Sequence, residues 1–392
     1  MLFTNYTESL VGIKDVILLN VQETLNTKII ELKIKQHTWS CPVCNSLTSK
    51  IHDYRTQNVK DIPMFGMKTI LRIHKRRYVC KECGKKFYEK IEILPKYQRT
   101  TNRLWGYVLS ELSLEYSMKS IAKRVNLSST SISRILDVLS FSPKTLPEAI
   151  SIDEFRGNTD GNKFQCIITN PKTHEVIDIL PRKKAEDLYE YFSKFDNRRD
   201  VKYVVMDMSI FFKNVMKACF PNAIIIADKY HVQRQVSWAL ENVRKRVQEE
   251  FHEDRRKYFK RSRTLLLKDF NKLKEDEFEQ LSHMLELSKD LAKSYYLMQE
   301  FYKVMDSKNY YEAKHRLSDW FMHYQVANIR EFDAAFRAYT NWQVEILNAF
   351  DTGLSNGYTE GCNNRIKVIK RNAYGMRNFE RFRKRIMHVM TA

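Results

Sequence analysis

The chain has 392 residues, which is enough for two or three domains of ordinary size. Its 67 Lys and Arg residues outnumber its 47 Asp and Glu residues and give a formal net charge of +20, so nucleic acid is the first candidate partner. No apolar run reaches the roughly 18 residues of a membrane span, and the amino terminus lacks the layout of a signal peptide. We therefore expect a soluble, cytoplasmic protein with no membrane partner.

Residues 1–100 carry four of the seven cysteines in two C-x-x-C pairs, Cys41 with Cys44 and Cys80 with Cys83. An odd number of cysteines argues against a disulfide framework, whereas two such knuckles bring four thiolates to one ion. The pattern predicts a structural Zn²⁺ site in a zinc ribbon. Two alternatives stay open: a pair of redox motifs, and a zinc site completed by His37, His52 or His74.

The segment between the two cysteine pairs is basic and strand-like, as in KTILRIHKRRYV. A metal-held strand of this kind can present cations to DNA phosphates. The residues that we expect to do so are Arg72, Lys75, Arg76 and Arg77.

Residues 101–145 are expected to contain a helix-turn-helix. Two short helices are predicted in the segment MKSIAKRVNLSSTSISRILDVLS, with a break at residues 126–128 and Ser128 as the cap of the second helix. An ordinary core hairpin would bury the same apolar positions, but the small polar start of the second helix favours contact with a DNA groove. The expected contacts are Ser129, Thr130, Ser131 and Arg134.

A change of period after a proline-containing linker marks residues 146–230 as an α/β domain. Strand-like runs cover residues 149–155, 162–170 and 174–180, and two further runs at 201–207 and 222–228 alternate with helical segments. Residues 231–352 then lack glycine and proline and show helical spacing, so they should form long helices. Residues 353–392 bring glycines back and end in a basic helical tail.

Two of the apolar runs end in an acid. Asp153 follows residues 149–152 and Asp207 follows residues 203–206. Carboxylates at neighbouring strand ends can share a divalent metal ion. Each acid also has an ordinary explanation, because Asp153 could lie in a turn and Asp207 could cap the next helix.

Glu360 is the third candidate acid. It lies near the start of a predicted helix after a glycine-containing segment, and its helical face continues with Asn364, Lys367 and Arg371. A carboxylate among amides and cations is typical of a surface that handles phosphate.

Together the cysteine pairs, the helix pair and the segments SIDEF, VVMDM, IADKYHVQRQ and NGYTEGCNNRIKVIKRNAYG resemble the bacterial insertion-sequence transposases of the ISL-three family. The resemblance covers nearly the whole chain. It implies a ribonuclease-H-like catalytic domain with a large all-α insertion, preceded by a zinc ribbon and a helix-turn-helix. It also implies that Asp153, Asp207 and Glu360 hold two Mg²⁺ or Mn²⁺ ions.

The resemblance also extends to Asp228 and His231, which match an Asp-x-x-His element of the family. The implied role is supporting, in orienting DNA or a nearby carboxylate, although His231 could equally be a helix-start histidine. Asn364 and Lys367 are expected to support Glu360. In the basic tail the expected DNA contacts are Lys370, Arg371, Arg377 and Arg381.

The implied function is a DNA transposase that binds the ends of its insertion sequence and cuts and transfers DNA strands. Its partners would be double-stranded DNA, as transposon end and target, and further copies of itself in a homodimer or larger assembly. A non-enzymatic DNA-binding regulator is the main alternative. A nuclease of the same fold that cuts but never joins, and a redox enzyme, are further alternatives.

Overall fold

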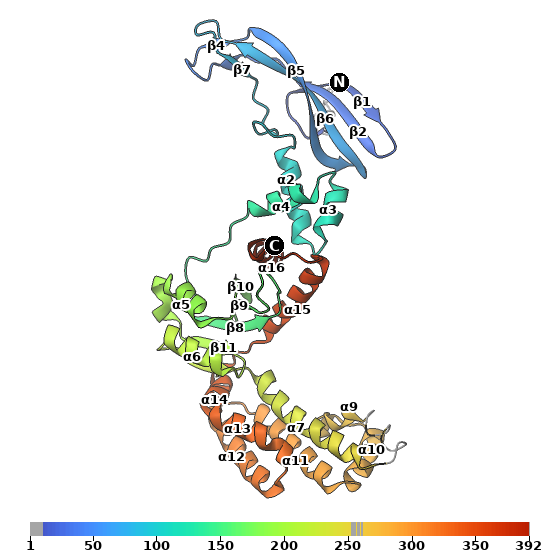
Figure 1. Ribbon diagram of the computed structural model, residues 1–392, viewed down its shortest axis with the longest axis vertical. Helices are drawn as coiled ribbons and strands as arrows, with labels where there is room; N and C mark the ends of the chain where they lie inside the picture. Colours follow the sequence, from blue (N-terminus) through green and yellow to red (C-terminus); the bar gives the residue numbers. More distant parts are fainter. Residues whose placement is uncertain (1–10, 252–255, 257–258, 260–261, 392) are drawn as a thin grey trace, which may run out of the picture. The chain divides into compact units, whose positions relative to one another are not determined.

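The computed structural model describes residues 11–251, 256, 259 and 262–391 (Figure 1). The chain divides into two compact units, one of Met1–Phe141 with Val368–Ala392 and the other of Ser142–Lys367. Each unit has hydrophobic clusters of its own. Within the described ranges, no helix combines the length and the apolar character needed to cross a membrane.

The amino-terminal part of the first unit is a sheet in the order β1-β2-β6-β5, with β7 paired to β6. Strands β2 and β6 run parallel, and the other pairs are antiparallel. Alternate residues of β2 and β6 are buried, and Leu32, Leu71 and Ile73 lie in one core. The strands are β1 (Val16–Glu23), β2 (Thr27–Ile34), β5 (Ile51–Met64), β6 (Met67–Val79), β7 (Lys86–Tyr88) and the small pair β3 (Trp39–Ser40) and β4 (Leu47–Thr48).

Three short helices follow, and they include the predicted helix pair. They are α2 (Asn102–Ser113), α3 (Met118–Arg124) and α4 (Ser129–Asp137). Ser128 caps α4, as predicted, by accepting a hydrogen bond from the backbone N–H of Ser131 at 3.1 Å. Asn126 takes the left-handed conformation, with φ of 56°, in the turn between α3 and α4. The helices share a core with Leu104, Ile121 and Ile132.

The last helix of the chain belongs to this first unit. Helix α16 (Phe379–Thr391) contacts both α2 and α4. Buried Arg385 donates to the backbone carbonyl oxygens of Leu112, Leu114 and Tyr116, which lie at and after the end of α2. We had expected residues 353–392 to belong together to the catalytic domain, but the part from Val368 onward is grouped with the helix-turn-helix because of such contacts.

The second unit is built on a five-stranded sheet in the order β10-β9-β8-β11-β12. The three strands β8, β11 and β12 are parallel, whereas β9 and β10 form antiparallel pairs. All five fall in the runs predicted as strands. Their bounds are β8 (Ala149–Phe155), β9 (Gln165–Asn170), β10 (Glu175–Leu180), β11 (Tyr203–Met206) and β12 (Ile224–Ala227).

Helices cover both faces of this sheet. On one face α5 (Ala185–Ser193) and α6 (Ile210–Cys219) pack Phe192 and Phe212 into a core with Ile152 and Val204. On the other face Ala349 of α14 packs on Val205 and Ile226. The sheet is therefore a largely buried layer, which explains why its strands read as continuous apolar runs.

Between β12 and the end of the unit the described chain contains no strand. Its core gathers around the buried aromatic side chains of Phe301, Trp320 and Tyr339, and the Tyr339 hydroxyl donates to the carbonyl oxygen of Val232 at 2.7 Å. The helices are α7 (Lys229–Glu249), α9 (Arg263–Leu266), α10 (Glu275–Glu286), α11 (Lys289–Met305), α12 (Tyr310–Ala327), α13 (Asp333–Asn341), α14 (Gln343–Thr352) and α15 (Gly357–Asn372), with short 3₁₀ helices at Phe270–Lys272 and Arg330–Phe332. A further 3₁₀ helix, Asp196–Asp200, lies earlier, between α5 and β11.

Candidate active site and zinc centre

Three adjacent parallel strands bring an aspartate to the same level of the sheet. Met206 of β11 pairs with Ile152 of β8 and with Ala227 of β12. The next residue on each strand is therefore an acid: Asp153, Asp207 and Asp228. Neighbouring strands lie about 4.8 Å apart, so this register alone places three carboxylates along one edge.

Asp153 is held in a buried environment by two hydrogen bonds. Its Oδ1 accepts the backbone N–H of Glu154 at 2.7 Å, and its Oδ2 accepts the side-chain amide of Asn363 at 2.8 Å. Burial, together with the charge of Asp207, raises the pKa of Asp153 to about 7, although the backbone N–H of Glu154 and the charge of His231 act in the opposite direction. Asp153 is thus a carboxyl group for which burial disfavours the negatively charged form.

Asp207 shares that environment. Burial raises the pKa of Asp207, while the positive charges of His231 and Lys183 oppose the rise. Its Oδ1 is buried and accepts no hydrogen bond from the described residues. A buried carboxylate oxygen without a partner is costly, and a metal ion bound to it would remove that cost.

Glu360 reaches this edge through His231. The imidazole Nε2 of His231 lies 2.9 Å from Oε1 of Glu360. Ligand atoms of Asp228, His231 and Glu360 all lie within 4.8 Å of one another, a spacing that could hold a metal ion. His231 is therefore a helix-start residue of α7 whose side chain also contacts the candidate acid.

Asp228 joins two helices by their amino ends. Its Oδ2 accepts the backbone N–H of His231 at 3.4 Å and so caps α7, and its Oδ1 accepts the backbone N–H of Asn356 at 2.9 Å, just before α15. Asp228 is 2% exposed. The structure thus uses both oxygens of this carboxylate to fix the positions from which His231 and Glu360 extend.

One face of α15 and the residue before it are held on the sheet by polar side chains. The amide of Asn356 accepts a short hydrogen bond from Ser151 of β8, and the hydroxyl of Thr359 lies 2.8 Å from that of Thr169 on β9. Asn363, two turns beyond Asn356, contacts Asp153. All three side chains are buried. They explain how Glu360 comes to lie beside residues far earlier in the chain.

The sequence-predicted residues are therefore partly brought together. Asp153, Asp207 and Glu360 share His231 as a neighbour, but their carboxylate oxygens do not all lie within 4.8 Å of one another in the described residues. Asn364 and Lys367, expected to support Glu360, lie on the exposed side of α15, where the Lys367 Nζ donates to Asn364 at 3.0 Å.

Asn363 and Asn356 were missed by the sequence prediction. The signal was available, because Asn356, Glu360 and Asn363 follow helical spacing of four and then three residues. The prediction followed the other neighbours of Glu360, at 364 and 367, which belong to the solvent side.

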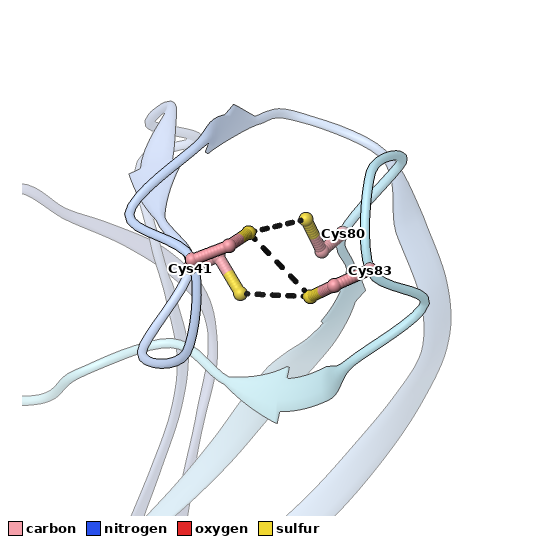
Figure 2. Close-up of side chains that lie close together, drawn as sticks. Cys41, Cys80 and Cys83 are labelled. Atoms are coloured by element: carbon pink, nitrogen blue, oxygen red, sulfur yellow. Dashed lines mark hydrogen bonds between the residues drawn. The ribbon is translucent and has the colours of Figure 1, made fainter.

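The four predicted cysteines form a second cluster, shown in Figure 2. Their sulfur atoms all lie within 4.8 Å of one another, and Sγ of Cys41 lies 3.5 Å from Sγ of Cys83. Asn45 and Gly84 close the two knuckles in the left-handed conformation, with φ of 61° and 69°. The geometry fits one tetrahedral Zn²⁺ ion bound by four thiolates.

None of the three histidines considered as zinc ligands belongs to this cluster among the described residues. The ring of His52 contacts Asp53 at 3.0 Å, and that of His74 contacts Glu31 at 2.6 Å. His37 packs edge-on against Trp39. The four-cysteine prediction is confirmed as a geometric arrangement.

Three of the predicted phosphate contacts on β6 are half-buried and one is buried. Arg76 is buried, 3.2 Å from Glu89, and donates to the carbonyl oxygen of Ile34, so its prediction as a phosphate contact was wrong. Strand alternation separates Arg76 from Lys75 and Arg77, since β6 turns neighbouring side chains to opposite faces. Arg72 and Lys75 are half-buried, and Arg77 lies 3.6 Å from Asp53.

The predicted DNA contacts on the helices also differ in their exposure. Ser129, Thr130 and Arg134 are exposed on α4, whereas Ser131 is half-buried and its hydroxyl lies 2.9 Å from that of Ser128. Arg381 is half-buried and forms an ion pair with Asp137 at 2.8 Å, in which both side chains remain partly exposed. Lys370 is half-buried, and Arg371 and Arg377 are exposed.

Comparisons with known proteins agree with these parts. A family profile described as a transposase matches residues 150–386, one described as the zinc-finger of transposase IS204/IS1001/IS1096/IS1165 matches residues 37–83, and one described as the helix-turn-helix domain of transposase family ISL3 matches residues 89–138.

Among known proteins, the chain is 25% identical over 366 residues to the transposase for insertion sequence element IS1001 of Bordetella parapertussis, which covers 91% of this chain and 90% of that protein. It is also 32% identical over 111 residues to a Lactococcus lactis protein described as an ATP-dependent protease, across 28% of this chain and 34% of the other. This second match is short and covers only part of each chain. The first transposase profile spans more than half of the sequence and includes Asp153, Asp207 and Glu360, and the chain therefore belongs to the ISL3 family of DNA transposases.

Proposed function

We propose that this transposase cuts and rejoins DNA at the ends of its own insertion sequence, with Asp153, Asp207 and Glu360 as the metal-binding acids. The observation that carries the proposal is the pair of half-buried aspartates at the ends of adjacent strands, both with raised pKa values. Like charges in a buried site are unfavourable unless a cation joins them.

The donor set fits a hard divalent cation. Carboxylate and amide oxygens are the ligands that Mg²⁺ and Mn²⁺ prefer. Asp207 Oδ1 and Asn363 Oδ1 are both buried without a hydrogen-bond partner in the described chain. Mg²⁺ or Mn²⁺ bound there would supply Lewis-acid stabilisation of the charge that develops on phosphate oxygens.

The protein's own residues would then orient the acids. Asn363 holds one oxygen of Asp153, and His231 holds one oxygen of Glu360. Asp228 fixes the start of α7 and the approach to α15. We assign a positioning role to these three residues, because each holds a candidate acid or the helix that carries it.

The remaining parts would bring DNA to that site. We propose that α4 enters a groove of the transposon end through Ser129, Thr130 and Arg134, which are exposed. The sheet order β10-β9-β8-β11-β12 with a helical segment before α15 supports a ribonuclease-H-like domain with an all-α insertion. Cutting two transposon ends together would need a homodimer or larger assembly.

The test is a cleavage assay on DNA that contains a transposon end, with Mg²⁺ or Mn²⁺ added. Asp153→Asn, Asp207→Asn and Glu360→Gln should each abolish cleavage and leave DNA affinity nearly unchanged. Asp351→Asn, at an exposed position near the end of α14, is the matched control and should cut normally. Cleavage at the normal rate by any of the three variants would remove that residue from the proposal.

A second substrate separates a transposase from a nuclease of the same fold. A DNA end that is already cut and carries a free 3′-hydroxyl should be joined to target DNA by the normal protein. A protein that cuts the first substrate but never joins the second would be a nuclease.

A further inference from the structure

A large groove lies in the first unit, between the zinc knuckles and the segment that leads to α2. Its volume is about 1020 Å³. This lies at the upper end of the range of about 300–1,000 Å³ for ligand clefts. None of the residues assigned above to catalysis or to the groove-binding helix lines it.

The groove is strongly basic. Seven lysines and arginines line it, including Lys85, Lys86 and Arg99, against one acid, Glu89, among the described residues. Glu89 does not offset this charge at the surface, because its carboxylate is buried and occupied by the backbone N–H of Arg76 at 2.7 Å and by the guanidinium of the same residue. The groove therefore presents cations to a polyanion.

Two exposed aromatic rings accompany these cations. Tyr88 is 47% exposed and Tyr97 is 90% exposed, and both line the groove. Tyr97 is also held in the left-handed conformation, with φ of 66°. A non-glycine residue in this region is strained, and such strain is found where the direction of a side chain matters.

The wall that carries Tyr97 is fixed to the sheet on both sides of that residue. Leu94 is buried in the sheet core. The side-chain amide of Gln57 donates to the carbonyl oxygen of Gln98 at 2.8 Å. The backbone N–H of Lys60 donates to the carbonyl oxygen of Arg99 at 2.9 Å. Tyr97 is therefore presented by an anchored segment.

We propose that this groove binds single-stranded DNA, with unpaired bases stacked on Tyr88 and Tyr97 and phosphates on the surrounding lysines and arginines. A cationic groove that also displays aromatic faces is the pattern of sequence-tolerant single-strand sites. Paired bases inside a duplex are already stacked and cannot reach such rings, whereas cations alone would serve a duplex equally well. Unpaired nucleotides arise wherever a DNA strand is cut, and in that respect alone the inference depends on the proposed function.

The experiment measures binding without divalent metal, so it does not depend on cleavage. The full-length protein is titrated into a fluorescein-labelled thymidine 12-mer and, separately, into a labelled mixed-sequence duplex, with anisotropy as the readout. Tyr88→Ala with Tyr97→Ala should weaken binding to the single strand by about tenfold or more. Binding to the duplex should change by less than about twofold.

Matched variants distinguish the ring from the fold and from the charge. Tyr88→Phe with Tyr97→Phe keeps both rings and should bind the single strand normally. Tyr54→Ala removes a 65% exposed tyrosine of β5 outside the groove lining and should have no effect. Lys85→Gln with Lys86→Gln should reduce the salt dependence of single-strand binding by about 0.7 per lost phosphate contact.

Two results would overturn the proposal. One is unchanged single-strand binding by the double alanine variant, provided that zinc content and thermal unfolding show a folded first unit. The other is an equal loss on single strand and duplex, which would make the groove a general phosphate-binding surface. If the double alanine variant does not fold, the Lys85→Gln and Lys86→Gln variant decides, and an unchanged salt dependence on the single strand then rejects the groove.

Discussion

At the scale of single residues, Asp153 combines burial with a second carboxylate nearby, so its charge depends on pH in the neutral range. Burial raises its folded-state pKa from 3.8 to about 7. Between these two values the folded protein keeps a proton that the unfolded chain has lost, and rising pH therefore favours unfolding. The cost appears above about pH 4 and is complete near pH 7.

Asp153→Asn should remove that cost. In buffer without added divalent cation, the variant should have a higher free energy of unfolding than the normal protein, on the order of a few kcal/mol at pH 8 and less at pH 5. Urea denaturation at the two pH values measures the difference, with Asp351→Asn as control. A gain that is the same at both pH values would contradict the pKa shift.

Asn363 tests whether an amide beside Asp153 positions this acid or only lies near it. Asn363→Ala should lower cleavage by about 10- to 100-fold and raise the Mg²⁺ concentration needed for half-maximal cleavage, because Asp153 loses its side-chain donor. Calorimetric titration with Mg²⁺ gives a readout that does not depend on turnover. Asn364→Ala is the matched control on the exposed side of α15 and should behave normally. Equal effects of the two changes would argue against a positioning role.

Asn363 and Asn364 also show what could not be predicted from the sequence at the scale of single residues. Asp153 and Asp207 could be proposed from the sequence, because an apolar run that ends in an acid indicates both a strand and a carboxylate at the end of that strand. The choice between Asn363 and Asn364 could not be made in that way. One residue rotates a helix position by about 100°, and only the docking of α15 through Asn356 and Thr359 decides which amide faces the sheet.

At the scale of elements, local pattern predicted the strands and the helix pair well, since each is defined by its own period, caps and turn. It did not predict what α16 packs against. The basic tail is expected from its sequence to bind phosphate. Arg385, however, is buried among backbone carbonyl oxygens of the segment after α2. This burial lowers the pKa of Arg385 to about 10. A cation that serves as a hydrogen-bond donor inside the fold has the same sequence signature as one that meets DNA.

Two arginines of this tail should therefore give opposite results. Arg385→Ala should destabilise the first unit by about 2–4 kcal/mol, because buried carbonyl oxygens lose a charged donor. Arg377→Ala, at an exposed position, should leave thermal unfolding unchanged and reduce the salt dependence of DNA binding by about one counterion. Melting curves and binding titrations at several salt concentrations test both. A stable Arg385→Ala variant would show that the contacts of α16 matter little.

At the scale of the whole molecule, the structure indicates which part of the first unit depends on zinc for its stability. The apolar core of the first sheet contains Leu32, Leu71 and Ile73, but none of the four cysteines. We therefore expect metal to stabilise the knuckle end of the ribbon and not the whole of residues 1–100.

Hydrogen exchange on the zinc-free protein tests this expectation. Cys80→Ser, or removal of zinc by a chelator, should expose backbone amides at residues 39–48 and 80–88 and leave those of β2 and of the catalytic sheet protected. The groove described above shares this end of the ribbon, so single-strand binding should fall as well. Loss of protection throughout both units would mean that the chain folds only with its metal.

The packing of α16 on the helix-turn-helix also has a consequence for the order of events during synthesis. A chain grows from its amino terminus and its domains generally fold as they emerge. The helices α2, α3 and α4 emerge early, whereas α16, which covers α2 and α4, emerges only after the whole of the second unit. The packing of the helix-turn-helix is therefore completed only after the second unit has been translated. A product that ends before Glu360 would lack both this acid and the support of α16 for its helix-turn-helix, so it should bind DNA less well than a chain that includes α16.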